Sequence, residues 1–238
     1  MTRLLVINPN TSPAMTESIE AMVRAHAPPA WEIVAVTARF GAPVIASRVS
    51  YAIAGHAVLE AFAAAGEDFD CAVIACFGDP GLEALRELTS VPVIGFAEAA
   101  IHAAAREAVP FAVLTMGAPW VEMLRERIAV AGASRLLVDV FALDGTGLDA
   151  LGGPDALVRA LAAAVETAIA HGAANIILGG ATLAGLGPRL PVGPRYVDCI
   201  SAALVEAGEA RRRLAGRKFS DRRSVGLSTP LQALLARS

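Results

Sequence analysis

The sequence predicts an α/β fold, in which helices cover both faces of parallel β-sheets. Short apolar runs of strand length alternate with longer segments whose apolar residues recur at helical spacing. The chain has 238 residues, of which 55% are hydrophobic and 18% charged, so it can bury a large core. The alternation restarts near residue 111, which makes the two halves of the chain alike in layout.

The first half contains four predicted strand–helix pairs. The runs RLLVI, WEIVAVT, CAVIAC and PVIGF have the length and the apolar content of buried strands. Either Thr11 or Ser12 is expected to cap the first helix, because a hydroxyl can accept from the free amides of a first turn. Gly41 and Pro43 predict a loop over residues 38–50. Strands are expected at 3–7, 31–37, 71–76 and 92–96, and helices at 14–26, 51–65, 80–89 and 97–107.

The second half repeats this order with different loops. The runs FAVL and NIIL read as buried strands, and the segment 155–170 is a long helix rich in alanine. A loop with four glycines is expected at 144–154. Strands are expected at 111–114, 136–141, 175–178 and 195–197, and helices at 120–131, 155–170 and 198–213.

The stretch DCAVIACFGDPG, at 70–81, carries the main chemical candidate. It brings one thiol, Cys76, to the point where a buried strand ends and a loop rich in Gly and Pro begins. Ligands of open α/β sheets bind at the carboxyl ends of the strands. The third strand of the second half also ends in small residues, at Gly179 and Gly180, so we expect these two loops to face each other across a cavity. The alternative for Cys76 is a buried structural cysteine, as we expect of Cys71.

Composition excludes several classes of protein. The three cysteines are an odd number without a disulfide framework, and no Cys or His spacing predicts a metal site. No apolar run is long enough to span a bilayer, and no signal peptide is evident, so we expect a cytoplasmic protein with no membrane partner. The net charge is −3, although residues 211–238 hold eight Lys or Arg and one acid. This basic tail lacks interleaved aromatic residues, so nucleic acid is not an expected partner, and helices rich in Ala and Leu favour a homo-oligomer.

Six stretches, which together span roughly residues 1–210, are INPNTS, ACFGDPGL, PVIGFAEAA, LTMGAPW, ILGGATLAGL and YVDCISAAL. In this order they resemble one family, the aspartate/glutamate/hydantoin racemase superfamily, and most closely its hydantoin and allantoin racemase branch. The stretch ACFGDPGL is the most specific of the six.

The resemblance implies two Rossmann-like lobes related by a pseudo-twofold, with the active site between them. It assigns residues 1–97 and 205–238 to lobe one and 98–204 to lobe two. Family members use no cofactor. Two cysteines flank the α-carbon of a small cyclic ureide or amino-acid derivative; one thiolate removes a proton and the other thiol returns one to the opposite face. The first cysteine matches Cys76, whereas the second position is occupied by Gly180.

The missing second cysteine leaves several alternatives open. Thr182 or Cys199 would supply the second proton, or the protein would be a single-cysteine decarboxylase or isomerase of the same superfamily. Cys76 would otherwise act as a nucleophile, or the chain would be a silent ligand-binding homologue. An enolate formed in the cavity would need backbone amides and polar side chains to stabilise it. The residues expected to bind substrate are Asn8, Asn10, Thr11, Phe40, Phe77, Gly78, Asp79, Thr115, Met116, Gly117, Gly179, Ala181 and Thr182.

Two of these residues have alternatives of their own. Phe40 is either part of the substrate site or part of the core. Asp79 either caps the helix that follows it or shapes the electrostatics of the thiol. The start of that helix, after Pro80, is expected to lower the pKa of Cys76 if the thiol faces it.

Overall fold

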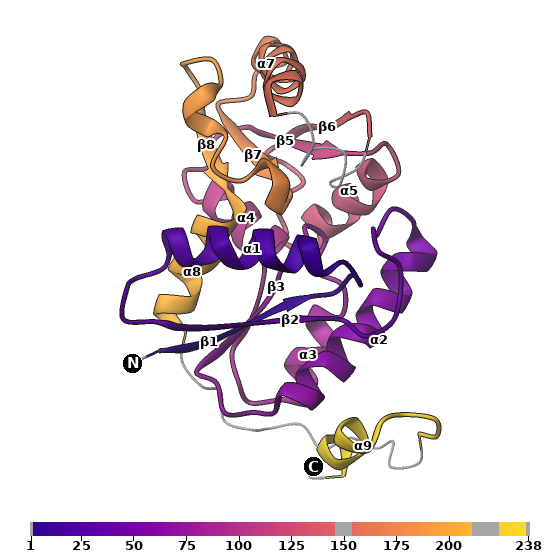
Figure 1. Cartoon of the computed structure of the whole chain (residues 1–238). Helices are drawn as coiled ribbons and strands as arrows, with labels where there is room; N and C mark the ends of the chain where they lie inside the picture. Colours follow the sequence, from indigo (N-terminus) through magenta and orange to yellow (C-terminus); the bar gives the residue numbers. More distant parts are fainter. Residues whose placement is uncertain (1, 146–153, 211–223, 237–238) are drawn as a thin grey trace.

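The computed structural model describes residues 2–145, 154–210 and 224–236 and shows two parallel sheets with helices packed on their faces (Figure 1). The α/β class with two similar lobes is therefore confirmed. The strand order is β2-β1-β3-β4 in the first sheet and β6-β5-β7-β8 in the second, so β1 corresponds to β5 and β3 to β7. The strands are β1 (Arg3–Asn8), β2 (Glu32–Thr37), β3 (Cys71–Ile74), β4 (Val93–Gly95), β5 (Phe111–Met116), β6 (Leu137–Leu143), β7 (Asn175–Gly179) and β8 (Arg195–Asp198).

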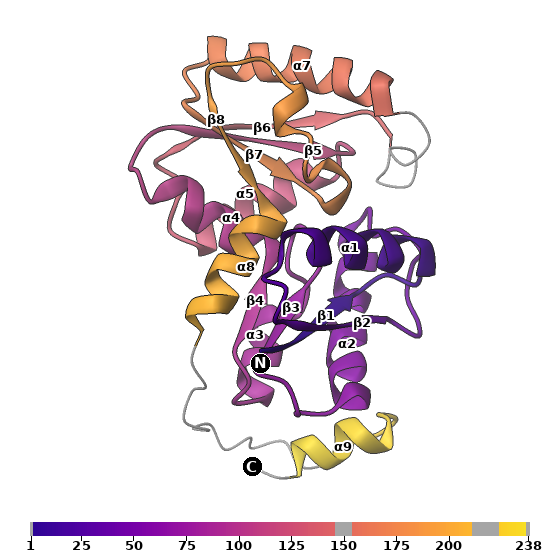
Figure 2. The same ribbon diagram turned by 60° about the vertical axis from the view of Figure 1, so that its left-hand side comes forward.

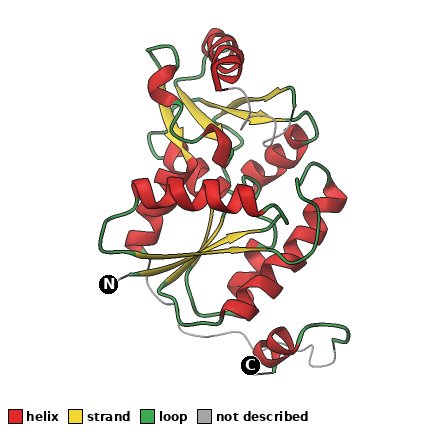
Figure 3. Cartoon of the chain, in the orientation of Figure 1, coloured by secondary structure: helices red, strands yellow, loops and turns green. Residues whose placement is uncertain are grey.

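The pleat of the strands divides each sheet into two apolar faces. In β1, Leu4 and Val6 belong to one buried cluster, while Leu5 and Ile7 belong to another. Helix α1 covers the first of these faces, and α2 and α3 cover the second (Figure 3). These helices are α1 (Pro13–His26), α2 (Arg48–Ala65) and α3 (Leu82–Leu88).

One apolar cluster joins the two lobes. It combines the α1 face of the first sheet with one face of the second, through α4, α5 and α8 (Figure 2). The other face of the second sheet packs against α7. The lobes therefore share a core. The cavity described below lies at the carboxyl ends of strands from both sheets. The helices are α4 (Phe96–Ala105), α5 (Trp120–Val130), α7 (Pro154–Ala170) and α8 (Cys199–Glu209).

Most element boundaries lie within a few residues of those expected, and two differences have clear causes. Helix α2 begins at Arg48 because Ser47 and Ser50 form a reciprocal capping box. Within the basic tail, for which no helix was expected, α9 (Thr229–Leu235) packs on α2 of the same chain because the apolar side chains of Leu231 and Leu234 are buried there.

Two expectations concern residues or boundaries that these observations do not test. Residues 211–213 of the last predicted helix lie outside the described residues, and the lobe boundaries at 97/98 and 204/205 stay predictions. Within the described ranges, no helix combines the length and apolar character needed to cross a membrane.

Candidate active site

A cavity of about 110 Å³ lies where strand ends of the two sheets meet. Loops that follow β1, β3, β5 and β7 all contribute to it, as expected for ligand sites of parallel sheets. The expected loops after β3 and β7 line the same cavity, Cys76 from one and Gly180 from the other. Its lining is Asn10, Met15, Ile19, Val44, Ile45, Ala46, Ala75, Cys76, Phe77, Thr115, Met116, Gly117, Pro119, Trp120, Gly145, Gly179, Gly180, Ala181 and Thr182.

Cys76 lies two residues beyond the end of β3 and is half-buried at the cavity wall. Its carbonyl oxygen accepts a hydrogen bond from the amide of Asp79 at 3.1 Å, which closes a tight turn. Burial raises the pKa of the Cys76 thiol, and the nearby Asp79 carboxylate raises it further. The direction is therefore opposite to the lowering expected for a thiol that faces the following helix. Cys76 rests as a neutral thiol.

Gly180 lies in the equivalent position after β7 and leaves this part of the cavity without a side chain. A Cβ added there would meet one neighbour, the Thr182 Oγ1 atom at 4.0 Å, so space is available. The backbone φ of Gly180 is +143°, a conformation that other residues rarely adopt. Thr182, in the short helix η1 (Ala181–Leu183), is thus the side chain nearest to the missing one.

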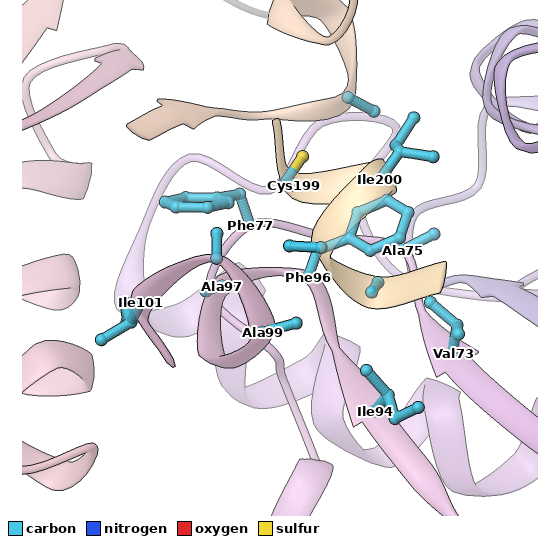
Figure 4. Close-up of a cluster of buried hydrophobic side chains, with 14 of the residues drawn as sticks. Val73, Ala75, Phe77, Ile94, Phe96, Ala97, Ala99, Ile101, Cys199 and Ile200 are labelled. Atoms are coloured by element: carbon cyan, nitrogen blue, oxygen red, sulfur yellow. The ribbon is translucent and has the colours of Figure 1, made fainter. Parts of the chain in front are cut away.

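Cys199 does not line the cavity. It is the first residue of α8 and is fully buried. Figure 4 draws it within the same apolar cluster as Phe77, Phe96 and Ile200. Burial raises the pKa of this thiol, and the Gly180 amide beside the sulfur offsets part of the rise. Cys199 is therefore sealed in the core next to a cavity residue, and its expected role as a second proton donor finds no support in this structure.

The two asparagines of the first loop have different places. Asn8 is fully buried and does not line the cavity, contrary to expectation. Its Nδ2 donates to the Oδ1 of Asn10 and to the hydroxyl of Thr16, both at 2.9 Å. The Oδ1 of Asn10 also accepts from the amide of Ser12 at 2.9 Å, which fixes the orientation of the side chain. Asn8 therefore shapes the loop, whereas Asn10 lines the cavity.

Asp79 is fully buried behind the Cys76 turn and does not line the cavity either. Its carboxylate accepts from the amides of Ala97 at 2.9 Å and Glu98 at 2.8 Å, in the first turn of α4. It caps this helix and not the following α3, whose cap residue is Gly81. Burial raises the pKa of Asp79 to about 7, although the Arg127 guanidinium opposes the shift.

Three further expected residues lie away from the cavity. Thr11 donates its amide to the carbonyl of Ala42 at 3.1 Å, which ties two loops together. Phe40 is 38% exposed, with its ring against His56, so it belongs to neither the site nor the core. Gly78 is not among the residues that line the cavity, and its carbonyl accepts from the Tyr51 hydroxyl at 2.7 Å. The structure does place the remaining expected residues at the cavity, namely Phe77, Thr115, Met116, Gly117, Gly179, Ala181 and Thr182.

An apolar wall of the cavity was not expected from the sequence. Met15 and Ile19 come from α1, and Val44 and Ile45 from the loop after β2. Trp120, at the start of α5 in the second lobe, donates its indole N–H to the carbonyl of Ile45 in the first lobe at 3.1 Å. The tryptophan directly after the strand-end loop LTMGAP was the one available signal; the others look like ordinary core residues.

The described cavity lining contains no Asp, Glu, Lys, Arg or His. It offers one neutral thiol, the polar side chains of Asn10, Thr115 and Thr182, and the backbone groups of its loops. Among the described residues, no group of three or more His, Cys, Asp or Glu side chains is arranged to hold a metal ion. This arrangement can bind a small neutral molecule and exchange a proton with it on the side of the thiol.

Comparison with known proteins agrees with this site. The Asp/Glu/Hydantoin racemase family model matches residues 4–207. A hydantoin racemase of Paenarthrobacter aurescens is 35% identical over 207 residues, covering 84% of this chain and 87% of the relative. The structure of the allantoin racemase of Klebsiella pneumoniae is 36% identical with a TM-score of 0.80, covering 88% of this chain and 87% of that one. The allantoin racemase of Pseudomonas fluorescens is 32% identical with a TM-score of 0.83, covering 87% and 89%. The chain therefore belongs to the Asp/Glu/hydantoin racemase family, on its hydantoin and allantoin racemase branch.

Proposed function

We propose that this protein transfers the proton at the carbon α to a carbonyl in a neutral cyclic ureide of the 5-substituted hydantoin class, with Cys76 as acid and base. Relatives named hydantoin racemase and allantoin racemase support this class of substrate. The observation that carries the proposal is a cavity with one thiol and no ionised side chain in its described lining.

The uncharged lining argues for a neutral substrate. A free amino acid or a dicarboxylate would enter a space without a countercharge, and burying an unpaired charge is costly. A hydantoin ring is neutral and needs only hydrogen-bond partners, for which Asn10, Thr115 and Thr182 are available. Of the two named substrates of the relatives, allantoin carries a polar ureido group at the reacting carbon. The wall formed by Met15, Ile19, Val44, Ile45 and Trp120 favours an apolar substituent instead.

The proposed step begins with the loss of the Cys76 proton to solvent. The thiolate then takes the α-proton, and the electron pair of the C–H bond moves into the carbonyl to form an enolate. A solvent-derived proton on the thiol returns to the same carbon, which exchanges the α-proton without net change. Because the pKa of Cys76 is raised, the thiolate is a minor form near neutral pH, and the rate is expected to increase with pH.

Inversion requires a proton on the opposite face, where Gly180 has no side chain to supply one. The Thr182 hydroxyl is nearest to that position, but an alcohol is a weak acid. We therefore propose that exchange on the Cys76 face is faster than racemisation. Water held by Thr182 would then deliver the second proton slowly.

The test is proton NMR of each enantiomer of 5-benzylhydantoin and of allantoin in deuterated buffer, read together with optical rotation and corrected for the uncatalysed rate. The expected result is Cys76-dependent exchange of the benzyl compound that precedes the loss of rotation, with allantoin slower. Cys76→Ala is expected to abolish exchange, whereas Cys199→Ala, the matched thiol control, is expected to retain it. Equal rates of exchange and racemisation would refute the one-face mechanism. No exchange of any substrate, with ligand-induced stabilisation only, would indicate a binding protein.

Gly180→Cys offers a complementary gain of function. The added Cβ has room, although the φ of +143° must relax toward a value that cysteine adopts. A second thiol on the opposite face is expected to increase racemisation relative to exchange. If the variant folds and this ratio does not change, position 180 does not face the reacting carbon.

A further inference from the structure

Behind the cavity, a cation from the second lobe reaches the turn that carries Cys76. Arg127 lies on α5 and is only 7% exposed. Its Nε is 3.4 Å from the Oδ2 of Asp79, and its Nη2 is 3.0 Å from the Oε1 of Glu98. A third contact joins its Nη1 to Glu83 on α3. One side chain thus connects α5 to the loop after β3 and to two helices.

The turn that receives this cation is under conformational strain. Asp79 has a φ of +57°, in a region that residues other than glycine seldom occupy. The two amide hydrogen bonds from α4 hold its carboxylate in place, and the Asp79 amide in turn donates to the carbonyl of Cys76. Any contact that restrains the Asp79 carboxylate therefore also restrains the backbone that presents the thiol.

Helix α5 touches the same loop a second time. Its first residue, Trp120, lines the cavity, and its ring fills the space in which a Cβ on Gly78 would lie. Arg127 is seven residues later, about two turns along the same face of the helix. The position of α5 relative to the loop is thus set at both ends, by an aromatic ring at the cavity and by a guanidinium behind it.

The charges around Asp79 come from every element packed against it. Arg127 and Arg86 are the cations, and Asp79 and Glu98 are the buried or half-buried anions. Glu83 of α3, His102 of α4 and the Tyr51 hydroxyl of α2 lie at the edge of this group, and Cys76 lies on its own loop. Arg127 is the group that lowers the pKa of Asp79 most.

Arg127 and Asp79 form an ion pair in which the Nε of Arg127 makes no hydrogen bond among the described residues. The Nε of Arg127 is buried and makes no hydrogen bond within the described residues, although Asp79 is its neighbour. A small approach of α5 would convert this ion pair into a hydrogen bond, and α5 also carries part of the cavity wall.

We propose, as an extension of the proton transfer proposed above, that Arg127 is a positioning residue whose guanidinium holds the Asp79 turn and thereby keeps the Cys76 thiol directed into the cavity. The ionised Asp79 carboxylate is the form that caps both α4 amides. Activity is therefore expected to require ionised Asp79, and the positive charge of Arg127 favours that form.

The first test is the pH dependence of hydantoin α-proton exchange in Arg127→Gln, Arg127→Lys and Arg48→Gln. Arg48 pairs with Glu126 on α5 at the surface, so its variant removes another contact between the lobes and is expected to match the parent. Ionisation of Asp79 is expected to add an inflection on the acidic limb of log kcat against pH, beside the rise caused by Cys76 ionisation. In Arg127→Gln, this inflection is expected to move by roughly one pH unit or more to the alkaline side, as loss of a neighbouring opposite charge predicts. KM is expected to change by less than about twofold, because neither Arg127 nor Asp79 lines the cavity. Arg127→Lys retains a positive charge without a guanidinium Nε, so its shift in the pH dependence of kcat is expected to be intermediate. This variant replaces Arg127→Gln in the test if the glutamine variant does not fold.

The second test needs no substrate. Amide hydrogen exchange at Ala97 and Glu98, measured by NMR, reports directly on the Asp79 cap, and it is expected to accelerate in Arg127→Gln but not in Arg48→Gln. A folded Arg127→Gln variant with either an unchanged acidic limb or unchanged amide protection overturns the proposal. If the parent catalyses no exchange on any hydantoin, the proposed function fails, and the amide exchange still decides whether Arg127 holds the turn.

Discussion

Replacement of Gly95 by alanine tests the packing that supports the Cys76 turn. Gly95 is the last residue of β4 and the cap residue of α4, with φ −99° and ψ 143°, an extended conformation that any residue adopts. A Cβ added there would overlap with the Cγ and both carboxylate oxygens of Asp79. These atoms are held by the amides of Ala97 and Glu98, so they cannot move aside as a free side chain would. The alanine must therefore displace the buried carboxylate from the helix.

The cost follows from the contacts that are lost. A hydrogen bond to a charged group contributes roughly 1.5–3 kcal/mol, so the loss of two costs about 3–6 kcal/mol. Alanine has a smaller conformational entropy than glycine in the unfolded chain, which offsets about 0.4–1 kcal/mol of this cost. The expected net decrease in the free energy of unfolding is about 2–5 kcal/mol, a large part of the roughly 5–15 kcal/mol of a typical domain.

The assay is equilibrium unfolding in urea, followed by circular dichroism, with Gly208→Ala as the matched control. Gly208 is the penultimate residue of α8, where a Cβ would make an ordinary contact with Trp31 at 3.7 Å, so its replacement is expected to change the free energy of unfolding by less than about 1 kcal/mol. A Gly95→Ala protein within about 1 kcal/mol of the parent would refute the reasoning, because the two hydrogen bonds could not then have been lost.

Three other outcomes are expected. Alkylation of Cys76 by iodoacetamide is expected to be slow near neutral pH and to increase about tenfold per pH unit, because its pKa is raised and only the thiolate reacts; a plateau below about pH 8 would contradict this. The hydrogen bond that His102 Nδ1 donates to the Glu206 carboxylate raises the pKa of His102, so the stability from this pair is present below the ordinary pKa of 6.5 and is lost as pH rises through the folded-state value. In His102→Gln, the free energy of unfolding in urea is expected to lack this pH-dependent component, which is less than about 1 kcal/mol. The same pH dependence in the variant and the parent would argue against the pair. Asn8→Asp is expected to lower the free energy of unfolding by about 2–4 kcal/mol, because a carboxylate would face the oxygens that now accept from its amide; a variant as stable as the parent in urea would contradict that network.

The sequence was most informative where local patterns determine structure. Apolar runs that end at Gly, Pro or Asn predicted the strands, and alternation with helical segments predicted the parallel sheets, because both depend on nearby residues. Helix α2 begins three residues before the expected start because Ser47 and Ser50 form a capping box. Both serines are visible in the sequence, so this boundary was open to prediction from a local pattern. Residues at strand ends, such as Cys76 and Thr115, were placed correctly because strand ends of parallel sheets converge.

The sequence was least informative where partners are distant along the chain. Asp79 caps α4, eighteen residues later, because folding brings the two loops together, and no local pattern distinguishes this from a cap on α3. Met15 and Ile19 line the cavity on a helix whose apolar face looks like ordinary core. The direction of the Cys76 pKa shift depends on burial and on the Asp79 carboxylate, which are properties of the folded chain.

The two lobes are alike in their strands and unlike in the side chains at their strand ends. The loop after β3 carries Cys76, and the equivalent loop after β7 carries Gly180. The cavity thiol of the described residues thus comes from the first lobe, while the second lobe contributes Trp120 to the cavity wall and Arg127 to the turn behind the thiol. A symmetric pair of thiols would make both lobes carry the proton transfer. In the proposed one-thiol mechanism, the second lobe instead shapes the space around Cys76, so a change in α5 should alter the rate without contact with the reacting carbon.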